Sequence, residues 1–146
     1  FSKAYGLAGF RVGYGFGHNE LIANLLKVKL PFEPSIPGQI AAIHALDDLE
    51  YLKSTLEMNK NEMRKLIYAL DNYGLDYLPS VANFITVVFK NEYDALLFNK
   101  KMLSNGVILR HLKGFGLPKC VRITVGNISE NKYFLEVLGK IMGSKK

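Results

Sequence analysis

The 146-residue sequence has little that could cross-link it or anchor it in a membrane. Cys120 is its only cysteine, so no disulfide can form within the chain, and this favours a reducing compartment. No run of eighteen apolar residues is present, which excludes a helix of the membrane-spanning kind. No signal peptide is recognisable and Phe1 is not an initiator, so we expect a processed, truncated or excised piece of a cytoplasmic protein.

Short motifs for common ligands and metals are missing as well. The glycines of GYGFGH lack the third glycine that a dinucleotide fingerprint needs, and no GxxxxGK[ST] phosphate loop occurs. His18, His44 and His111 have neither HxxxH nor HExxH spacing, and a single cysteine cannot build a metal site. We therefore expect no metal centre, interpret these histidines as structural or exposed, and identify no serine–histidine–acid arrangement.

Basic residues outnumber acidic ones by 19 to 13, which gives a formal net charge of +6. Such a balance favours anionic partners in general. The lysines are nevertheless scattered over the faces of expected helices, and the one dense pair, Lys145-Lys146, is a tail. We expect no nucleic-acid partner. With 49% hydrophobic and 22% charged residues, the chain has a globular composition and is long enough for a sizeable core.

The first fourteen residues, FSKAYGLAGFRVGY, combine a lysine, an arginine and three glycines. Lys3 and Arg11 are eight positions apart, and Ser2 precedes the lysine. An unprotonated lysine is a nucleophile, the rigid fork of an arginine suits phosphate, and glycines let the backbone approach a flat ligand closely. Composition alone favours a basic, glycine-rich surface loop.

The stretch SKAYGLAGFRVGY resembles the SKxxGLxxxRVG signature of fold-type I, pyridoxal-phosphate-dependent aminotransferases, and in particular the histidinol-phosphate aminotransferase group. The resemblance implies that Lys3 binds pyridoxal 5'-phosphate covalently, and that Arg11 and Ser2 hold the phosphate of this cofactor. The family usually has a further hydroxyl residue three positions before the lysine, a position that this chain does not include. Several other pocket residues of the family come from its N-terminal two-thirds, so we expect the isolated chain to be catalytically incompetent.

Three polar residues in expected strands extend the resemblance. It implies that Arg122, in RITVG, grips the substrate α-carboxylate, although an exposed edge-strand arginine is the alternative. It places Arg110, in GVILRHL, near the substrate phosphate, with a surface ion pair as the alternative. Asn83, in SVANF, matches a family asparagine, but a buried amide that satisfies nearby backbone is equally consistent. The segment PFEPS departs from the PYNxN of the group, so Glu33 leaves the exact substrate open.

Periodicity and turn residues predict the order of the elements. The expected elements are a short buried strand over 11–17, a helix capped by Asn19, a helix over 35–48, a long helix from about 47 to the stop at Gly74, a strand over 81–89, a helix over 92–104, strands over 107–112 and 120–126, and a last helix behind a capping box of Asn127 and Glu130. From residue 47 onward this order predicts a two-layer α+β domain.

The same patterns predict which side chains face inward. On the helices before residue 49 these are Leu21, Ile22, Leu25, Leu26, Ile36, Ile40, Ala42, Ile43 and Leu46. On the long helix they are Leu49, Leu52, Leu56, Met63, Leu66, Ile67 and Leu70. On the last two helices they are Tyr93, Leu96, Leu97, Leu103, Phe134, Leu135, Val137, Leu138 and Ile141.

The resemblance covers essentially the whole chain and implies its domain organisation and function. Residues 1–46 would be the C-terminal piece of the large cofactor-binding domain. Residues 47–146 would be the small domain, with helices on a short mixed or antiparallel sheet. The implied enzyme is a cytoplasmic homodimer of histidine or other amino-acid biosynthesis. It would transfer an amino group between an amino acid or amino-alcohol phosphate and 2-oxoglutarate.

Two kinds of alternative stay open. The first is a threonine-phosphate decarboxylase-like enzyme or an aromatic aminotransferase of the same fold, which Lys3, Arg11 and Arg122 do not distinguish from the first choice. Arg110 and Glu33 are the positions where these enzymes would differ. The second is a non-catalytic fragment that self-associates, because the apolar segment 1–46 would expose hydrophobic surface without its large-domain partners.

Overall fold

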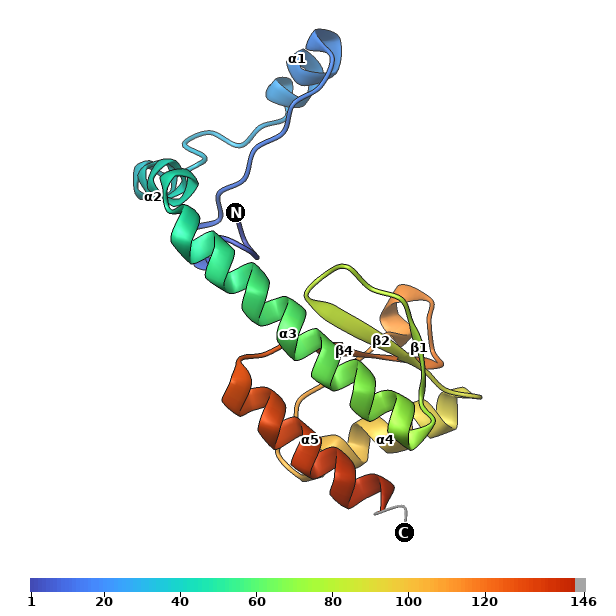
Figure 1. Cartoon of the computed structure of the whole chain (residues 1–146). Coiled ribbons are helices and arrows are strands. Elements are labelled where there is room, and N and C mark those ends of the chain that lie inside the picture. The colour runs from blue at the N-terminus through green and yellow to red at the C-terminus, as the bar shows by residue number, and fades with distance from the viewer. Residues whose placement is uncertain (144–146) are drawn as a thin grey trace. The chain divides into compact units, whose positions relative to one another are not determined.

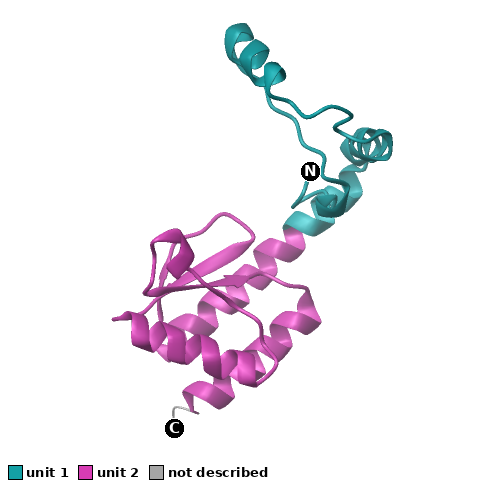
Figure 2. Cartoon of the chain, turned by 180° about the vertical axis from the view of Figure 1, so that it is seen from behind, with its two compact units in different colours: residues 1–56 teal, residues 57–146 magenta. Residues whose placement is uncertain are grey.

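The chain divides into two compact units, and the boundary between them falls within one long helix, α3 (Leu49–Tyr73) (Figures 1 and 2). The structure is a computed structural model that describes residues 1–143, so the Lys145-Lys146 pair lies outside the described residues. The units comprise residues 1–56 and 57–146, whereas the sequence places a domain boundary between 46 and 47. Among the described helices, none combines the length and the apolar character that a membrane crossing requires.

The first unit holds the short 3₁₀ helix η1 (Ala8–Phe10) and the helices α1 (Asn19–Lys27) and α2 (Ile36–Asp47). The predicted helix over 35–48 is confirmed, and the Ser35 hydroxyl caps it by accepting from Gly38 N at 3.2 Å. The cap of α1 is His18 rather than Asn19, since His18 Nδ1 accepts from Glu20 N.

The strand predicted over 11–17 is wrong. This segment carries no strand, and Tyr14 and Phe16 are 74% and 89% exposed. An isolated extended segment needs neighbouring strands to be stable, and the described part of this unit supplies no sheet.

The buried centre of the first unit is small. Val12, Gly38 and Ala42 are buried, and of the residues predicted to face inward before Leu49 only Ala42 is among them. The others are half-buried or exposed, and the exposed ones are Leu21, Leu25, Leu26, Ile36, Ile40, Ile43 and Leu46. Burial of these side chains would require a covering layer, which the described residues of this unit do not form.

The second unit is built around a four-stranded antiparallel sheet in the order β1-β2-β4-β3. The strands are β1 (Asp76–Leu78), β2 (Phe84–Val88), β3 (Arg110–His111) and β4 (Cys120–Thr124). The sequence did not predict β1, and β3 is shorter than the strand predicted over 107–112. Because β4 is a central strand, Arg122 does not lie on an edge.

Helices α3, α4 (Glu92–Ser104) and α5 (Ile128–Met142) pack on one face of this sheet (Figure 1). Strand side chains alternate between the two faces. Ile85, Val87, Val121 and Ile123 therefore point into the helical layer and join a single core with residues of all three helices. The other face carries the alternate residues of the same strands, which are Phe84, Thr86, Val88, Cys120, Arg122 and Thr124.

The inward face of α4 differs from the prediction. Ala95, Phe98 and Met102 are buried, whereas the predicted Tyr93, Leu96, Leu97 and Leu103 are exposed. Both sets follow helical spacing, and the small Ala95 belongs to the set that contacts the core. On the other helices the prediction holds best in the second unit, where Met63, Leu66, Leu70, Phe134, Val137 and Leu138 are buried.

The predicted helix ends are confirmed at two points. Gly74 follows α3 with a φ of 65°, in the left-handed region that suits glycine after a helix. Before α5, Asn127 Oδ1 accepts from Glu130 N at 3.0 Å, and Glu130 Oε2 accepts from Asn127 N at 2.8 Å. These reciprocal bonds are the capping box that the sequence predicted.

Candidate functional site

Lys3 lies in a tight turn at the start of the first unit. Gly6 N donates to Lys3 O at 2.9 Å, Leu7 N donates to Phe1 O at 3.1 Å, and Phe10 N donates to Leu7 O at 3.1 Å. These bonds hold the backbone on both sides of the lysine, and its side chain is exposed. The amine is therefore presented to solvent on a backbone that is fixed locally.

Gly6 is required by this turn for two separate reasons. Its φ of 68° is left-handed, and a Cβ at this position would lie 2.7 Å from Tyr51 Oη on α3. Any other residue would be strained and would also push against the tyrosine. The glycine of the motif thus sets both the backbone direction after Lys3 and the contact of the turn with α3.

Arg11 closes η1 with an unusual backbone conformation. Its φ is 51° and its ψ is 42°, which is the left-handed region, and its Nη1 donates to Ala8 O at 3.0 Å. One guanidinium N–H is used in this way, and the exposed side chain has further donors for an anion. No hydrogen bond or ion pair joins Ser2, Lys3 and Arg11 within residues 1–143, and Ser2 is half-buried.

Arg122 lies on the sheet face that is opposite the helices. It is half-buried, and its guanidinium carbon lies 5.3 Å from the centroid of the Phe84 ring. Its Nε is buried and has no hydrogen-bond partner among the described residues. A buried charged donor without a partner is costly, so this N–H is prepared to bind an acceptor from outside the chain.

Arg110 is the neighbour of Arg122 across the strand pair. The two residues are partners in the β3–β4 register, and Thr86 is the partner of Arg122 on the other side. Residues opposite each other in an antiparallel pair share a face, so both guanidinium groups lie on the helix-free side. Arg110 is exposed, and its guanidinium carbon lies 5.5 Å from the centroid of the Phe115 ring.

Asn83 lies at the end of the sheet where β4 finishes. Its backbone carbonyl accepts from Val125 N at 2.9 Å, directly after β4. Its side chain is half-buried and makes no hydrogen bond to the part of the chain that is described. The structure therefore brings Arg110 and Arg122 onto one sheet, with Asn83 directly before β2, and it places Ser2, Lys3 and Arg11 in the first unit.

Two buried polar residues beside this sheet were missed by sequence reasoning. Glu62 and Asn131 are each 3% exposed, and Asn131 Nδ2 donates to Glu62 Oε2 at 3.0 Å. A signal existed, because Glu62 is on the stripe of Leu66 and Leu70, and Asn131 is one turn before Phe134. Polar residues at inward helical positions indicate a buried hydrogen bond.

The pKa of Glu62 lies below its ordinary value. The largest cause is the hydrogen bond from Lys65; together with a smaller contribution from Asn131 and the charge of Lys65, it outweighs the burial that would raise this pKa. The buried carboxyl group is therefore held in its ionised form, as a hydrogen-bond acceptor for Asn131.

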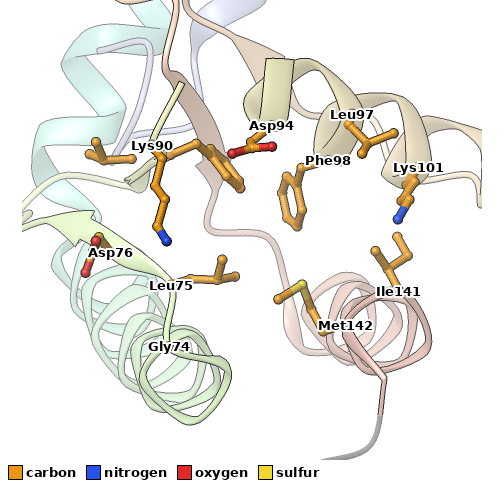
Figure 3. A pocket seen from close by; sticks show the side chains of 12 residues that line it. Gly74, Leu75, Asp76, Lys90, Asp94, Leu97, Phe98, Lys101, Ile141 and Met142 are labelled. Atoms are coloured by element: carbon orange, nitrogen blue, oxygen red, sulfur yellow. The ribbon is translucent and has the colours of Figure 1, made fainter. Parts of the chain in front are cut away.

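A groove of about 350 Å³ lies elsewhere in the second unit, between the end of α3, α4 and α5 (Figure 3). Its apolar surface includes Leu75, Phe98 and Met142, and Lys90 reaches in from the end of β2. None of the predicted site residues lines it.

His111 is accounted for structurally, since its Nε2 donates to Pro118 O at 2.6 Å.

Comparison with known proteins gives consistent results. Residues 1–138 match the family described as "Aminotransferase class I and II". The chain is 43% identical over 142 residues to histidinol-phosphate aminotransferase 1 of Nitrosococcus oceani, and 42% identical over 142 residues to the histidinol-phosphate aminotransferase of Brevibacillus brevis. Each alignment covers 97% of this chain and 38% of the relative, so the chain spans well under half the length of these proteins.

Solved structures show the same similarity. The crystal structure of histidinol-phosphate aminotransferase from Sinorhizobium meliloti, in complex with pyridoxal-5'-phosphate, superposes with a TM-score of 0.88 at 31% identity. The match covers 97% of this chain and 39% of that one. A putative aminotransferase from Burkholderia pseudomallei superposes with a TM-score of 0.87 at 27% identity, over 98% of this chain and 44% of that one.

Proposed function

The chain belongs to the aminotransferase class I and II family, and from this premise we propose that it is the C-terminal part of a pyridoxal-phosphate-dependent aminotransferase of the histidinol-phosphate group. Residues 1–46 would complete the large domain, and residues 47–146 would form the small one. The observation that carries the proposal is the pair of arginines on the open sheet face, in which Arg122 Nε is buried with no acceptor among residues 1–143.

The residues of the first unit suit pyridoxal phosphate. Lys3 offers an exposed amine for the aldehyde, while Ser2 and Arg11 offer a hydroxyl and a guanidinium for the phosphate. The bond from Arg11 to Ala8 O holds this side chain and leaves other N–H groups unused by it. When bound, pyridoxal phosphate supplies an electron sink for the charge that develops at the substrate α-carbon. Lys3 Nζ would then take the proton from that carbon as a general base.

The arginine pair suits a substrate with two anionic groups or one dianion. Arg122 would bind a carboxylate through its fork, and Arg110 would bind a second carboxylate or a phosphate. These groups occur in 2-oxoglutarate and in an amino-alcohol phosphate. Asn83 lies directly before β2 of the same sheet and would contact the bound substrate or cofactor. We further propose a cytoplasmic homodimer, which the exposed apolar residues of α1 and α2 and the lack of disulfides support.

The first experiment tests Lys3 on the isolated 146-residue chain. The chain is mixed with pyridoxal phosphate and reduced with borohydride, and the modified peptide is identified by mass spectrometry. We expect a reduced adduct at Lys3 that Lys3→Ala abolishes. Lys29→Ala is the matched control, because Lys29 is another exposed lysine of the same unit. We expect no half-transamination of an amino acid by the isolated chain, and robust turnover would contradict this part of the proposal.

The second experiment restores the part that the relatives have. In a chimera, this chain replaces the matching 142 residues of the Nitrosococcus oceani relative. We expect amino transfer between histidinol phosphate and 2-oxoglutarate, which Lys3→Ala eliminates. Phenylalanine as a better donor, or release of carbon dioxide from threonine phosphate, would favour the two alternative enzymes. A folded chimera that binds pyridoxal phosphate but processes none of these substrates would refute the proposed activity.

A further inference from the structure

A buried amide holds the turn that follows the Arg122 strand. Asn131 Nδ2 donates to Gly126 O at 2.8 Å, and Asn131 Oδ1 accepts from Gly126 N at 3.0 Å. One side chain thus binds both backbone polar groups of a single residue. Gly126 packs closely against the first turn of α5, since a Cβ on it would lie 2.9 Å from Glu130 Cβ. The turn is therefore fixed by hydrogen bonds on one side and by close packing on the other.

Glu62 on α3 binds the same Asn131 amide. Asn131 Nδ2 also donates to Glu62 Oε2, and Glu62 Oε1 accepts from Lys65 Nζ. Glu62 and Asn131 are 69 positions apart in the sequence and are both buried, so their bond joins two elements that are otherwise linked through apolar packing. Burial of an ionised carboxyl is costly, and an apolar pair of similar size would often be as stable.

A second bond from α3 reaches the neighbouring loop. Asn59 Nδ2 donates to Ala82 O at 3.3 Å, directly before Asn83, and Asn83 O accepts from Val125 N. Asn59 and Glu62 are three positions apart and lie on one face of the helix. The turn that follows β4, the strand of Arg122, and the loop before β2, which includes Asn83, are thus both tied by polar bonds to one helical turn.

We propose that Glu62 and Asn131 are positioning residues for the substrate site on the second unit. They fix the Gly126 turn, and through it the backbone between Arg122 and the Asn83 carbonyl. A guanidinium that binds a carboxylate through two parallel bonds must be placed within a fraction of an ångström. The proposal rests on the proposed function for the role of Arg122, whereas the bonds themselves do not depend on it.

The experiment uses the full 146-residue chain and four variants. Asn131→Ala removes the amide. Met63→Ala is the matched control, because Met63 is buried next to Glu62 in the same core and has no part in the polar bonds. The third variant is Asn131→Asp, which replaces the Nδ2 donor to Glu62 and to Gly126 O with a carboxylate oxygen. The fourth combines it with Glu62→Gln, which restores a hydrogen bond across the pair with donor and acceptor reversed, but not the bond to Gly126 O. Each variant is compared by thermal unfolding, amide hydrogen exchange and NMR titration with 2-oxoglutarate, followed at the Arg122 Nε–H signal.

In Asn131→Ala we expect the Val125 and Gly126 amides to exchange about tenfold faster. The ratio between the exchange rates of the Val87 and Val121 amides should stay as in the wild type. We expect 2-oxoglutarate to bind about fivefold more weakly, with a shifted Arg122 Nε–H signal. Met63→Ala should lower the midpoint of thermal unfolding without either effect. The double variant should recover part of the exchange protection that Asn131→Asp alone loses.

Two outcomes would overturn the inference. One is an Asn131→Ala chain that matches Met63→Ala at Val125, Gly126 and the Arg122 signal, since both would then act through stability alone. The other is a double variant that is no better than Asn131→Asp alone. If the wild type does not bind 2-oxoglutarate, the exchange data still test whether the pair fixes the Gly126 turn, and the Arg122 Nε–H signal of the unliganded chain tests whether this effect reaches the arginine. Such a lack of binding would count against the proposed role of Arg122.

Discussion

Arg110 and Arg122 stand directly opposite each other on β3 and β4, so two positive charges share one face of a sheet. Like charges at such positions cost about 0.2–1 kcal/mol when nothing neutralises them. Each guanidinium lies over a different aromatic ring, Phe115 for Arg110 and Phe84 for Arg122. The rings offset part of this cost, and a bound anion would offset more.

The arginine pair predicts a specific response to phosphate. The midpoint of thermal unfolding should rise with added phosphate more than with chloride at the same ionic strength. In Arg110→Gln the additional rise should largely disappear. The free energy of unfolding at low salt should change by less than about 0.5 kcal/mol, because lost repulsion and lost ring contact oppose each other. Lys119→Gln is the control, as Lys119 is exposed and also precedes β4. Equal phosphate responses in Arg110→Gln and wild type would contradict the prediction.

Gly6→Ala should destabilise the turn that presents Lys3. The left-handed φ of Gly6 costs about 1–2 kcal/mol for a residue with a Cβ, and the contact with Tyr51 Oη adds to this. Tyr51→Phe removes that oxygen, and the nearest remaining ring atom is 3.6 Å away, so the double variant should recover the steric part only. Limited proteolysis and the yield of the reduced Lys3 adduct measure the effect. Gly9→Ala, where a Cβ meets nothing within 4 Å, is the control.

The carboxyl of Glu62 predicts a pH dependence of stability. The Lys65 and Asn131 hydrogen bonds hold its pKa below the ordinary value, so ionised Glu62 favours the folded state. This contribution is complete above the unfolded-state pKa of about 4.3 and is lost as the pH falls further, through the folded-state value. Urea denaturation of wild type and Glu62→Gln should therefore differ most near neutral pH and converge in acid. A difference that grows as the pH falls would reverse the sign and refute this explanation.

The exposed apolar faces of α1 and α2 predict self-association of the isolated chain. Ile40 and Ile43 are 51% and 62% exposed on α2, beside other exposed apolar residues of the first unit. Light scattering should show dimers or larger oligomers, and Ile40→Lys with Ile43→Lys should shift the chain toward the monomer. Leu103→Lys, on the exposed side of α4, should not. A wild-type chain that is a clean monomer at high concentration would contradict the prediction.

Helix ends and long helices were predictable because their signals are local. Asn127 and Glu130 predicted a capping box, Gly74 predicted the end of α3, and the helix over 92–104 has the bounds of α4. Strand β1 was missed because three residues before Pro79 are too few to show an alternating pattern. The prediction of the inward face of α4 was wrong because two apolar stripes on this helix follow the same spacing, and only tertiary contacts decide between them.

The candidate site was predictable to a different extent in its two parts. The motif around Lys3 and the strand of Arg122 are continuous stretches of sequence, so their residues could be named. The register that places Arg110 opposite Arg122 depends on a pairing between strands separated by the η2 (Lys113–Phe115) loop. The bond between Glu62 and Asn131 spans 69 positions. Only folding brings such partners together, and no local pattern could identify them as a pair.

Cys120, two residues before Arg122, is buried in the central strand β4 and is the only thiol of the chain. This residue is only 6% exposed, so a thiol reagent reacts with it mainly when the surrounding structure opens locally. The labelling rate therefore reports local opening around β4, with no competing thiol to correct for. A ligand that binds across Arg110 and Arg122 would lower the labelling rate of Cys120 in proportion to the fraction of chains that are bound. The natural cysteine would then report the occupancy of the arginine pair.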